Sequence, residues 1–245
     1  MTFVRKMLIS VRNFFIKQKP FFSGYNKKFP VNMANSRCAI SHSGKFIYFR
    51  IPKSANSTVV ASLSYAETGV LPSEQADIRK IKKSYSLPST VSRSDMGSVN
   101  DYYKFSIVRN PYTRIVSAYV DKVHRGKPEK AKVARYFSRD VNEHISFDEF
   151  LSYLESGGIY EDAHWAPQTD LIFIPIEELD YLGKIETIGR DLPFILNELF
   201  KKSDIVDWRP HASSHEKVKI ELDSNQKKKI YALYKNDFIS LGYDC

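Results

Sequence analysis

Two short apolar runs, each followed by a polar turn and then by a helical pattern, constrain the fold of this chain more than any other feature. The runs KFIYFRI (45–51) and YKFSIV (103–108) are rich in β-branched and aromatic residues and predict buried strands. Helices are expected over about 56–67 after the first run and over about 111–124 after the second. Because alternating strands and helices build a mostly parallel central sheet flanked by helices, the sequence predicts an α/β fold.

The rest of the chain adds further predicted elements and no internal repeat. These are helices over 146–154, 190–200 and 224–239, strands at LIFIPI (171–176) and YLGKIE (181–186), and a polar loop over 84–100. A hydrophobic content of 42% over 245 residues can bury a substantial core in one domain. We therefore expect a single domain over 31–245, preceded by a basic amphipathic segment over 1–30.

The first segment places apolar residues at helical spacing with cations between them. The apolar positions are Val4, Met7, Leu8, Val11, Phe14 and Phe15, and the cations are Arg5, Lys6, Arg12 and Lys17. Such a helix can lie on an anionic membrane surface, or it can pack on the domain or fray as a terminus. No stretch reaches the roughly 18 uninterrupted apolar residues of a membrane span.

The charge balance indicates an anionic partner. The formal net charge is +9 and the sequence pI is near 9.3, which suits a nucleotide, an acidic glycan, a nucleic acid or a membrane surface. The only two cysteines, Cys38 and Cys245, form no disulfide framework or zinc ribbon, so a reducing compartment is expected.

The first polar turn, PKSANST (52–58), contains residues that suit an anion-binding site. A helix that begins just after Ser54 would point unpaired backbone N–H groups and its positive dipole end at the loop. Lys53 adds a movable charge, and Ser54, Ser57 and Thr58 add hydroxyl donors. The alternative is a solvated turn whose polar residues only cap the helix. The glycines of a Walker A loop are absent, which disfavours a nucleotide triphosphatase.

The second polar turn, RNPYTR (109–114), also begins a helix. Asn110 suits the N-cap position and Pro111 the first helical position. Ser117 returns nearly two turns later to the same face, so Arg109 and Ser117 can bind one phosphate. Arg114 either joins them as a second guanidinium or is an ordinary surface charge.

Two anion sites, each after a strand, suggest a ligand with phosphates at both ends. IPKSANST resembles the 5′-phosphosulfate-binding loop of sulfotransferases, and VRNPYTRIVSAY resembles their 3′-phosphate-binding strand, loop and helix. The pair implies a P-loop-NTPase-like sulfotransferase fold, with 3′-phosphoadenosine 5′-phosphosulfate (PAPS) as donor and adenosine 3′,5′-bisphosphate (PAP) as product.

Two later stretches resemble the carbohydrate sulfotransferases, in particular the chondroitin and dermatan 4-O-sulfotransferase group. DAHWAPQTDLIFIPIEELDYLGKIETIGRD is similar to that group's H-W and G-K-x-E-T segment, and LYKNDFISLGY to its closing helix. The resemblance implies sulfuryl transfer to a hydroxyl of a glycan, either a polysaccharide or a lipid-linked sugar. Asn56 stands where glycine or alanine is common, and Ile172 and Phe173 stand near positions that hold cysteines in Golgi members. With no N-terminal anchor, the chain is expected to be cytoplasmic and bacterial, or peripheral at the inner face of the membrane.

The resemblance also implies roles for individual residues. Lys53 would contact the 5′-phosphate and the bridging oxygen, while Arg109 and Ser117 would bind the 3′-phosphate. The donor-binding loop would consist of Lys53, Ser54, Ala55, Asn56, Ser57 and Thr58. No metal is required by this chemistry.

The catalytic base is left open between an imidazole and a carboxylate. His164 in DAHW is the first candidate because imidazole titrates near neutral pH, although it can instead stabilise a turn against Trp165. Glu67 and Glu74 are carboxylate alternatives, and Glu186 in GKIET either competes or anchors a loop.

Other functions are weighed against sulfuryl transfer. A nucleotide or small-molecule kinase would require ATP and Mg²⁺, and a noncatalytic module would bind polyanions without a nucleotide pocket. The run Lys227–Lys229 fits the solvated face of a helix, so no nucleic-acid partner is expected. His211 and His215 have zinc-ligand spacing but no third ligand nearby, so we expect no metal site; the serines of that segment could instead close over the nucleotide.

Overall fold

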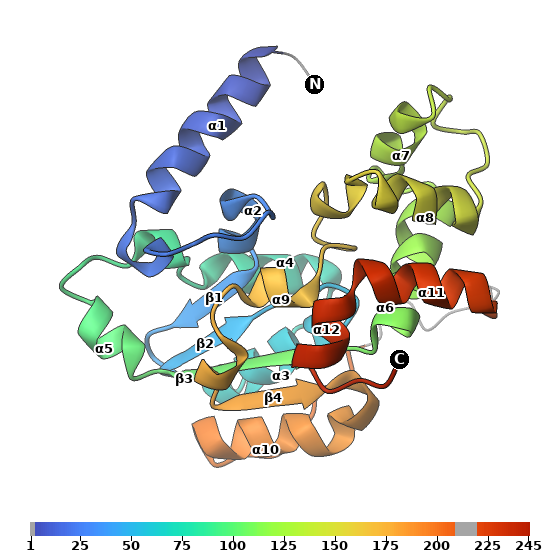
Figure 1. Cartoon of the computed structure of the whole chain (residues 1–245). Helices are drawn as coiled ribbons and strands as arrows, with labels where there is room; N and C mark the ends of the chain where they lie inside the picture. The colour runs from blue at the N-terminus through green and yellow to red at the C-terminus, as the bar shows by residue number, and fades with distance from the viewer. Residues whose placement is uncertain (1–2, 209–219) are drawn as a thin grey trace.

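The computed structural model describes residues 3–208 and 220–245, apart from the side chains of residues 3–6. Its centre is a four-stranded sheet in the order β1-β2-β3-β4 (Figure 1). The strands are β1 (Cys38–Ser41), β2 (Phe46–Phe49), β3 (Tyr103–Val108) and β4 (Tyr181–Lys184). β1 pairs antiparallel with β2, whereas β2, β3 and β4 pair in parallel, so the predicted mostly parallel sheet is confirmed.

Helices of three kinds surround the sheet. The α-helices are α1 (Phe3–Lys17), α2 (Val31–Asn35), α3 (Asn56–Thr68), α4 (Gln75–Ser84), α5 (Met96–Asn100), α6 (Pro111–Ala118), α7 (Lys130–Tyr136), α8 (Phe147–Glu155), α9 (Gln168–Ile172), α10 (Ile188–Phe200), α11 (Ser224–Leu233) and α12 (Lys235–Ser240). A π-helix (Tyr119–His124) continues α6, and short 3₁₀ helices lie at Pro20–Phe22, Pro88–Thr90, Gly158–Tyr160, Ile176–Glu178 and Ile185–Thr187.

Each face of the sheet has its own apolar layer. On one face α3 and α10 bury Val60, Leu63 and Leu192 against the strands. On the other face the layer is formed by α2, α9 and the segment before α2, and it includes Phe29 and Leu171. The predicted single α/β domain flanked by helices is therefore confirmed.

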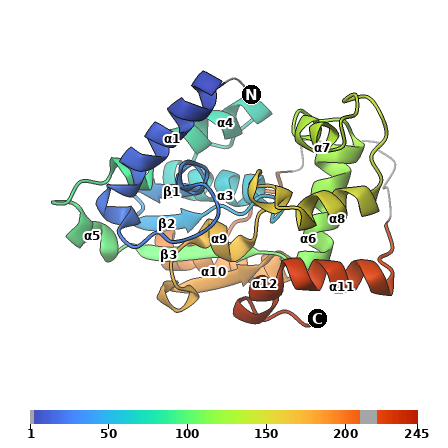
Figure 2. The ribbon, with the colours of Figure 1, turned by 45° about the horizontal axis from the view of Figure 1, so that its top comes forward.

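A third apolar cluster lies among helices beyond the carboxyl end of β3. α6 leads from that strand into a group formed with α7, α8 and α11, whose buried residues include Ile115, Phe150 and Trp165 (Figure 2). The candidate site lies where this group of helices meets the sheet. α6 contributes residues both to the helical cluster and to the lining of the site.

Several predicted elements differ from the structure. The run LIFIPI is not a strand: α9 ends at Ile172, Phe173 takes a left-handed backbone with φ 45°, and a 3₁₀ helix follows. Asp237 explains the helix, because its carboxylate accepts hydrogen bonds from the backbone N–H groups of Gln168 and Thr169 at 2.7 and 2.9 Å.

The remaining differences concern ends and loops. The polar stretch over 84–100 contains a 3₁₀ helix and α5, and Ser86 bridges to Ile40 of the unpredicted strand β1. The helix expected over 224–239 is two helices, because Tyr234 leaves helical geometry with ψ 24°. The expected strand YLGKIE is confirmed over Tyr181–Lys184.

The first helix extends away from the body of the molecule (Figure 1). Among its described side chains, over residues 7–17, the buried one is Ile16 in the last turn, which packs against Phe22 and Val31. Within the part of the chain that the structure describes, no helix is both long and apolar enough to cross a membrane.

Candidate active site

The two polar turns of the sequence lie side by side. They follow β2 and β3, which pair in parallel with Phe49 opposite Ser106. Both turns therefore leave the sheet on the same side, at the carboxyl ends of the strands. Nη1 of Arg109 in the second turn donates a hydrogen bond to the carbonyl oxygen of Lys53 in the first, at 3.1 Å. The pairing that the sequence predicted from two separate motifs is thus a direct contact.

The first turn has a strained backbone. Lys53 has φ 71° and Ala55 has φ 52°, a left-handed conformation that is unfavourable for residues with a Cβ atom. Asn56 begins α3, and Ala55 is the cap residue without a side-chain cap bond. The glycine-free loop therefore closes at Lys53 and Ala55, whereas the sequence drew attention to Asn56. Alternating backbone of this kind turns N–H groups toward one point.

A cavity of about 430 Å³ lies over this turn. Its lining combines residues of both turns with groups from elsewhere in the chain: Arg37, Pro52, Lys53, Ala55, Asn56, Ser57, Thr58, Lys82, Arg109, Ser117, Asp121, His164, Ile185 and Trp208. Most of the predicted donor-binding residues, and the predicted base, thus face one cavity.

Ser54 lies differently from the other loop residues. Its side chain is fully buried and is not part of the cavity lining. Its Oγ makes no hydrogen bond with any described residue. A buried hydroxyl without a partner costs free energy. Ser54 is thus the predicted donor-binding residue that does not face the first cavity.

A second cavity, of about 630 Å³, adjoins the first. It shares Lys53, Arg109, Ser117 and Asp121 with the first cavity and is otherwise lined by Tyr112, Thr113, Val116, Val120, Arg125, Ile220 and Leu222. Apolar residues beside cations suit a ligand that has both a flat base and phosphates.

Lys53 is paired with a residue that the sequence did not single out. Its Nζ lies 2.9 Å from Oδ2 of Asp121, which the π-helix presents to the cavity. Burial lowers the pKa of Lys53, although the hydrogen bond to Asp121 opposes this effect. Burial would raise the pKa of Asp121, but its bonds to Lys53 and Lys122 hold it below the usual value.

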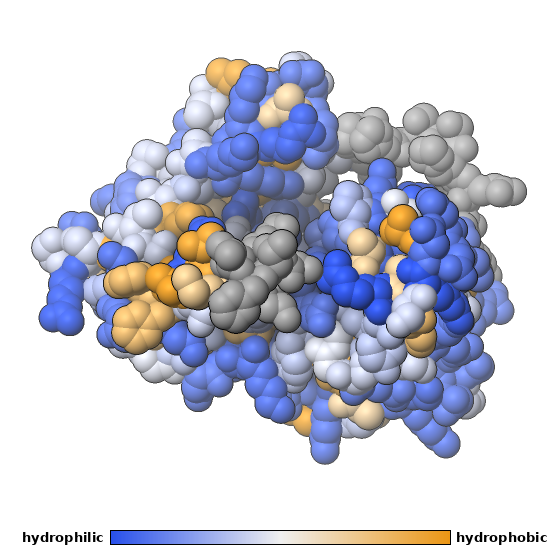
Figure 3. Space-filling view, turned by 90° about the horizontal axis from the view of Figure 1, so that it is seen from above, coloured by the Kyte–Doolittle hydropathy of each residue, from blue (hydrophilic) through white to orange (hydrophobic). Residues whose placement is uncertain are grey.

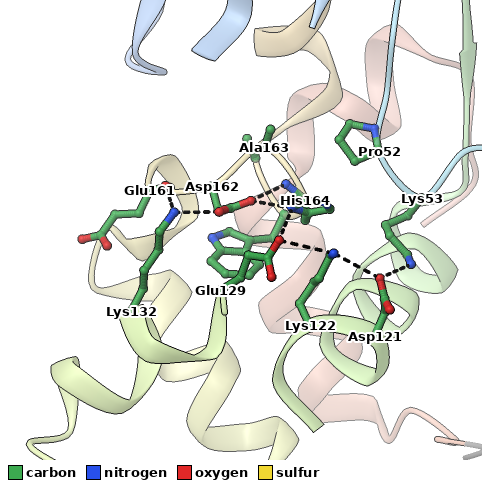
Figure 4. Close-up of polar contacts among 12 residues, drawn as sticks. Pro52, Lys53, Asp121, Lys122, Glu129, Lys132, Glu161, Asp162, Ala163 and His164 are labelled. Carbon is green, nitrogen blue, oxygen red and sulfur yellow. Dashed lines mark hydrogen bonds and ion pairs between the residues drawn. The ribbon is translucent and has the colours of Figure 1, made fainter. Parts of the chain in front are cut away.

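A chain of alternating charges connects Lys53 to His164 (Figure 4). Asp121 also contacts Lys122 at 3.5 Å, and Lys122 contacts Glu129 at 3.3 Å. Glu129 in turn lies 3.7 Å from Nδ1 of His164. The two residues predicted to be catalytic are therefore joined through three side chains from the π-helix and the residues that follow it.

His164 is oriented by Asp162. Nδ1 of the imidazole lies 2.7 Å from Oδ1 of Asp162, and Lys132 contacts the other carboxylate oxygen at 2.6 Å. Burial lowers the pKa of His164 below its usual value, while Asp162 raises it in part. The pKa of Asp162 is itself lowered despite its burial, by its bonds to His164 and Lys132, so the carboxylate is ionised and Nδ1 carries the proton.

The contacts also include the turn considered for His164: its backbone N–H and its Nδ1 both contact Oδ1 of Asp162, at 3.0 and 2.7 Å. Trp165 is buried in the helical cluster, and its Nε1 donates to the carbonyl oxygen of Gly158 at 2.9 Å. Every polar contact of the His164 ring with a described residue uses Nδ1, and the side chain lines the first cavity. The neutral ring therefore has an unprotonated Nε2 that is available to a ligand.

Arg109 is held in place from two sides. Its Nε donates to Oγ1 of Thr113 at 2.9 Å, and its backbone N–H and C=O are both bound by the side chain of Gln168, at 2.9 and 2.8 Å. No contact with a described residue uses Nη2. Burial lowers the pKa of the guanidinium, which remains charged.

Arg114 has neither of the roles considered from the sequence. It is 2% exposed, and its guanidinium donates to the carbonyl oxygens of Pro52, Ala166 and Ala163 at 3.1, 2.8 and 3.2 Å. It is therefore neither a surface charge nor part of either cavity lining. It ties the first turn to the segment that carries His164.

The glutamates proposed as alternative bases lie outside both cavity linings. Glu67, at the far end of α3, accepts hydrogen bonds from Ser41 and Ser43. Glu74 caps α4 at the end away from the turn. Glu186 accepts from the backbone N–H of Asn110 at 2.8 Å and from Tyr243 at 3.0 Å, so it anchors the second turn. Asp121 is the carboxylate that both cavities share.

Two further cations line the first cavity and had no signal in the sequence. Nζ of Lys82 donates to Oγ of Ser57 at 2.9 Å, and burial together with Arg50 and Arg37 lowers its pKa to about 8. Burial also lowers the pKa of Arg37. Both come from elements outside the two motifs, so only the folded chain places them here.

The histidine pair His211 and His215 lies outside the described residues. Among the residues that are described, no group of three or more His, Cys, Asp or Glu side chains is arranged to hold a metal ion.

The lysine-bearing loop that ends β2 and precedes α3 thus contacts the turn that carries Arg109, and Ser117 lies on the helix after that turn. The sulfotransferase family model matches residues 36–244, so the chain belongs to the sulfotransferase family.

Its curated relatives include carbohydrate sulfotransferases. The chain is 26% identical to carbohydrate sulfotransferase 11 of Danio rerio over 83% of the chain and 66% of the relative. For carbohydrate sulfotransferase 9 of Homo sapiens the identity is 24% over 85% and 53%, and for carbohydrate sulfotransferase 10 of Xenopus laevis it is 28% over 59% and 48%. The chain thus spans about half to two thirds of the length of these relatives. No solved structure matches the chain significantly.

Proposed function

We propose that this protein transfers a sulfuryl group from PAPS to a hydroxyl of a glycan. The observation that carries the proposal is the direct contact between the two turns, which brings Lys53, Arg109 and Ser117 to adjoining cavities in a sulfotransferase-family chain. The glycan class is inferred from relatives that are named carbohydrate sulfotransferases.

The 5′ end of the donor would lie at the first turn. The backbone N–H groups at the start of α3, the hydroxyls of Ser57 and Thr58, and the cation of Lys53 all suit phosphate and sulfate oxygens. These donors support the proposal that an anion binds at the N-terminus of α3.

The 3′-phosphate would lie at the second turn. Arg109 is fixed through Nε, Nη1 and its backbone, which leaves Nη2 for a ligand. Ser117 lines both cavities and adds a hydroxyl. Preorganisation of this kind lowers the entropy lost when a phosphate binds.

The transfer itself exchanges one sulfur–oxygen bond for another. The acceptor oxygen forms a bond to sulfur, the bond from sulfur to the bridging oxygen breaks, and the acceptor proton passes to Nε2 of His164. Lys53 stabilises the negative charge that develops on the leaving 5′-phosphate of PAP, which requires it to turn from Asp121 toward the bridging oxygen.

The acceptor and the location are parts of the same proposal. A polysaccharide and a lipid-linked sugar both supply the required hydroxyl. A cytoplasmic location is supported by two free cysteines, the buried Cys38 and the exposed Cys245.

A transfer assay tests the proposal. Labelled PAPS is incubated with the protein and a panel of acidic polysaccharides and lipid-linked sugars, and label in each glycan is measured. We expect label in one glycan class with the wild-type protein and about a hundredfold less with Lys53→Ala. Equal labelling by both proteins, or no labelled glycan in the panel, would count against the proposed reaction.

A further inference from the structure

The first helix presents an apolar face that the rest of the molecule does not cover. Five large apolar residues of α1 are between 46% and 62% exposed, namely Met7, Leu8, Val11, Phe14 and Phe15. Their spacing of three and four residues places them on one side of the helix. The other exposed large apolar residues that are described come from separate parts of the chain.

The opposite side of the same helix faces the domain. Ile16 is buried, Ile9 is half-buried, and Oδ1 of Asn13 accepts a hydrogen bond from the backbone of Asn32 at 3.1 Å. The helix is therefore docked through one side, so its orientation relative to the domain is set and the apolar side is turned outward. Figure 3 shows hydrophobic residues gathered on this face of the molecule.

The charges around the apolar face have one sign. Residues 1–30 contain seven Lys or Arg residues and no Asp or Glu. Arg12 and Lys17 of α1 are exposed, and they flank the apolar residues on opposite sides of the helix. A second copy of the chain would bring the same positive charges to this face, so self-association through it would be opposed by repulsion.

We propose that α1 binds the surface of an anionic lipid bilayer. An apolar face of aromatic and aliphatic residues between rows of cations matches the boundary between acyl chains and negatively charged headgroups. The helix lies in the plane of the surface and holds the domain beside it. This binding is independent of sulfuryl transfer, although it would bring the enzyme close to an acceptor that is attached to a lipid.

Vesicle sedimentation tests this inference without donor or acceptor. The full chain is mixed with vesicles of phosphatidylcholine alone, or of phosphatidylcholine and phosphatidylglycerol in about a 3:1 ratio, and bound protein is measured at low and high salt. We expect binding to the anionic vesicles only, weakened by salt. Arg12→Gln with Lys17→Gln should weaken it by about fivefold for each cation removed.

Matched variants distinguish binding through the apolar face of α1 from nonspecific adsorption to vesicles. Phe14→Glu with Phe15→Glu should reduce binding to anionic vesicles by about tenfold or more, because it places charge in the acyl boundary. Ile239→Glu, at an equally exposed apolar residue on α12, should leave binding unchanged. Circular dichroism and urea unfolding report that each variant is folded.

Three results would overturn the inference. They are no binding of the wild-type chain to anionic vesicles, equal binding by the double phenylalanine variant, and loss of a dimer of the wild-type chain in that variant, which would assign the face to a second copy.

Discussion

At the scale of single residues, the charge of Lys53 is controlled by two opposing effects. Burial lowers its pKa, and the pairing with Asp121 counters this by stabilising the ammonium form. Asp121 thus keeps the lysine charged before a donor is bound. In the proposed reaction the same carboxylate would compete with phosphate for the cation, so we expect Lys53 to contribute less to donor binding than to stabilising the charge that develops during transfer.

The Lys53→Ala variant measures this difference. We expect turnover to fall by about a hundredfold and PAP affinity to fall by less than about tenfold, because the lost interaction strengthens only as the bond to sulfur breaks. Single-turnover transfer and calorimetric PAP binding give the two values. Lys83→Ala, at an exposed position on α4, is the control. An unchanged rate in the Lys53 variant would remove its leaving-group role.

If His164 is the base of the proposed reaction, it and Asp162 should give kcat/KM a defined pH dependence. Burial holds the pKa of His164 below its ordinary value of 6.5, so the ring is neutral at pH 7 and kcat/KM should fall only as the pH drops through that lowered pKa. Asp162 raises the pKa of the ring. Asp162→Asn should therefore move the acidic fall of kcat/KM to still lower pH and reduce the plateau by about tenfold or more.

A pH profile of kcat/KM for the wild-type, Asp162→Asn and His164→Ala proteins checks this expectation. His164→Ala should lose turnover while PAP affinity stays nearly intact. A plateau reduction in Asp162→Asn without any shift of the acidic fall would show that Asp162 only supports the fold. Retained activity in His164→Ala would direct the search for the base to Asp121.

At the scale of elements, Arg114 of α6 connects the first turn to the segment of His164, although its side chain lines neither cavity. Arg114 donates to carbonyl oxygens on both sides of the site, at Pro52 and at Ala163 and Ala166. Because all three acceptors are backbone groups, the guanidinium sets the distance between the donor loop and the segment of His164. A buried cation in such a place is costly unless every donor is bonded.

Arg114→Met should therefore destabilise the protein. The variant leaves three buried carbonyl oxygens without donors, and we expect the free energy of unfolding to fall by about 3 kcal/mol. Urea unfolding followed by circular dichroism measures it. Arg79→Met, at an exposed arginine on α4, should change stability little. A small loss in the Arg114 variant would show that the three carbonyl groups find other partners.

The sequence predicted the elements whose signals are local. The strands over 45–51 and 103–108, the cap at Asn110 and the loop at Lys53 all follow from neighbouring residues, and the structure has them. Arg114 could not be placed in this way, because its acceptors lie about 50 to 60 residues away along the chain. The same reason explains the strand wrongly predicted over 171–176, because α9, which occupies its first two positions, begins at backbone N–H groups that are bonded by Asp237.

The same limit applies to the residues that line the candidate site. Each of the two turns carries its own motif, which can be recognised from neighbouring residues. Asp121, Lys82 and Arg37, in contrast, reach the cavity from the π-helix, α4 and the segment before β1. A single charged side chain on a helix gives no sign of the cavity it will face. Such residues become visible only when tertiary contacts are known.

At the scale of the whole molecule, the sheet places the two loops of the candidate site side by side. β2 and β3 are adjacent and parallel, so the loops that follow them are held about one strand spacing apart by the most buried part of the fold. The proposed donor, which has phosphates at both ends, would contact both loops and would be bound only by the native state. Its binding free energy therefore adds to the stability of the whole domain.

PAP should accordingly raise the melting temperature far more than ATP does. At a PAP concentration of about 100 times its Kd, linkage gives roughly 2.7 kcal/mol and an increase of roughly 5–10 °C for a domain of this size. ATP has no 3′-phosphate, so Arg109 and Ser117 remain without their partner and the increase should be small. Differential scanning calorimetry of the full chain, with each nucleotide at the same concentration, measures both. Arg109→Ala should bring the PAP increase down to the ATP value, because it removes the guanidinium that distinguishes the two ligands. Equal increases with PAP and ATP in the wild-type protein would show that the second turn binds no phosphate, and the assignment of the donor would then be wrong.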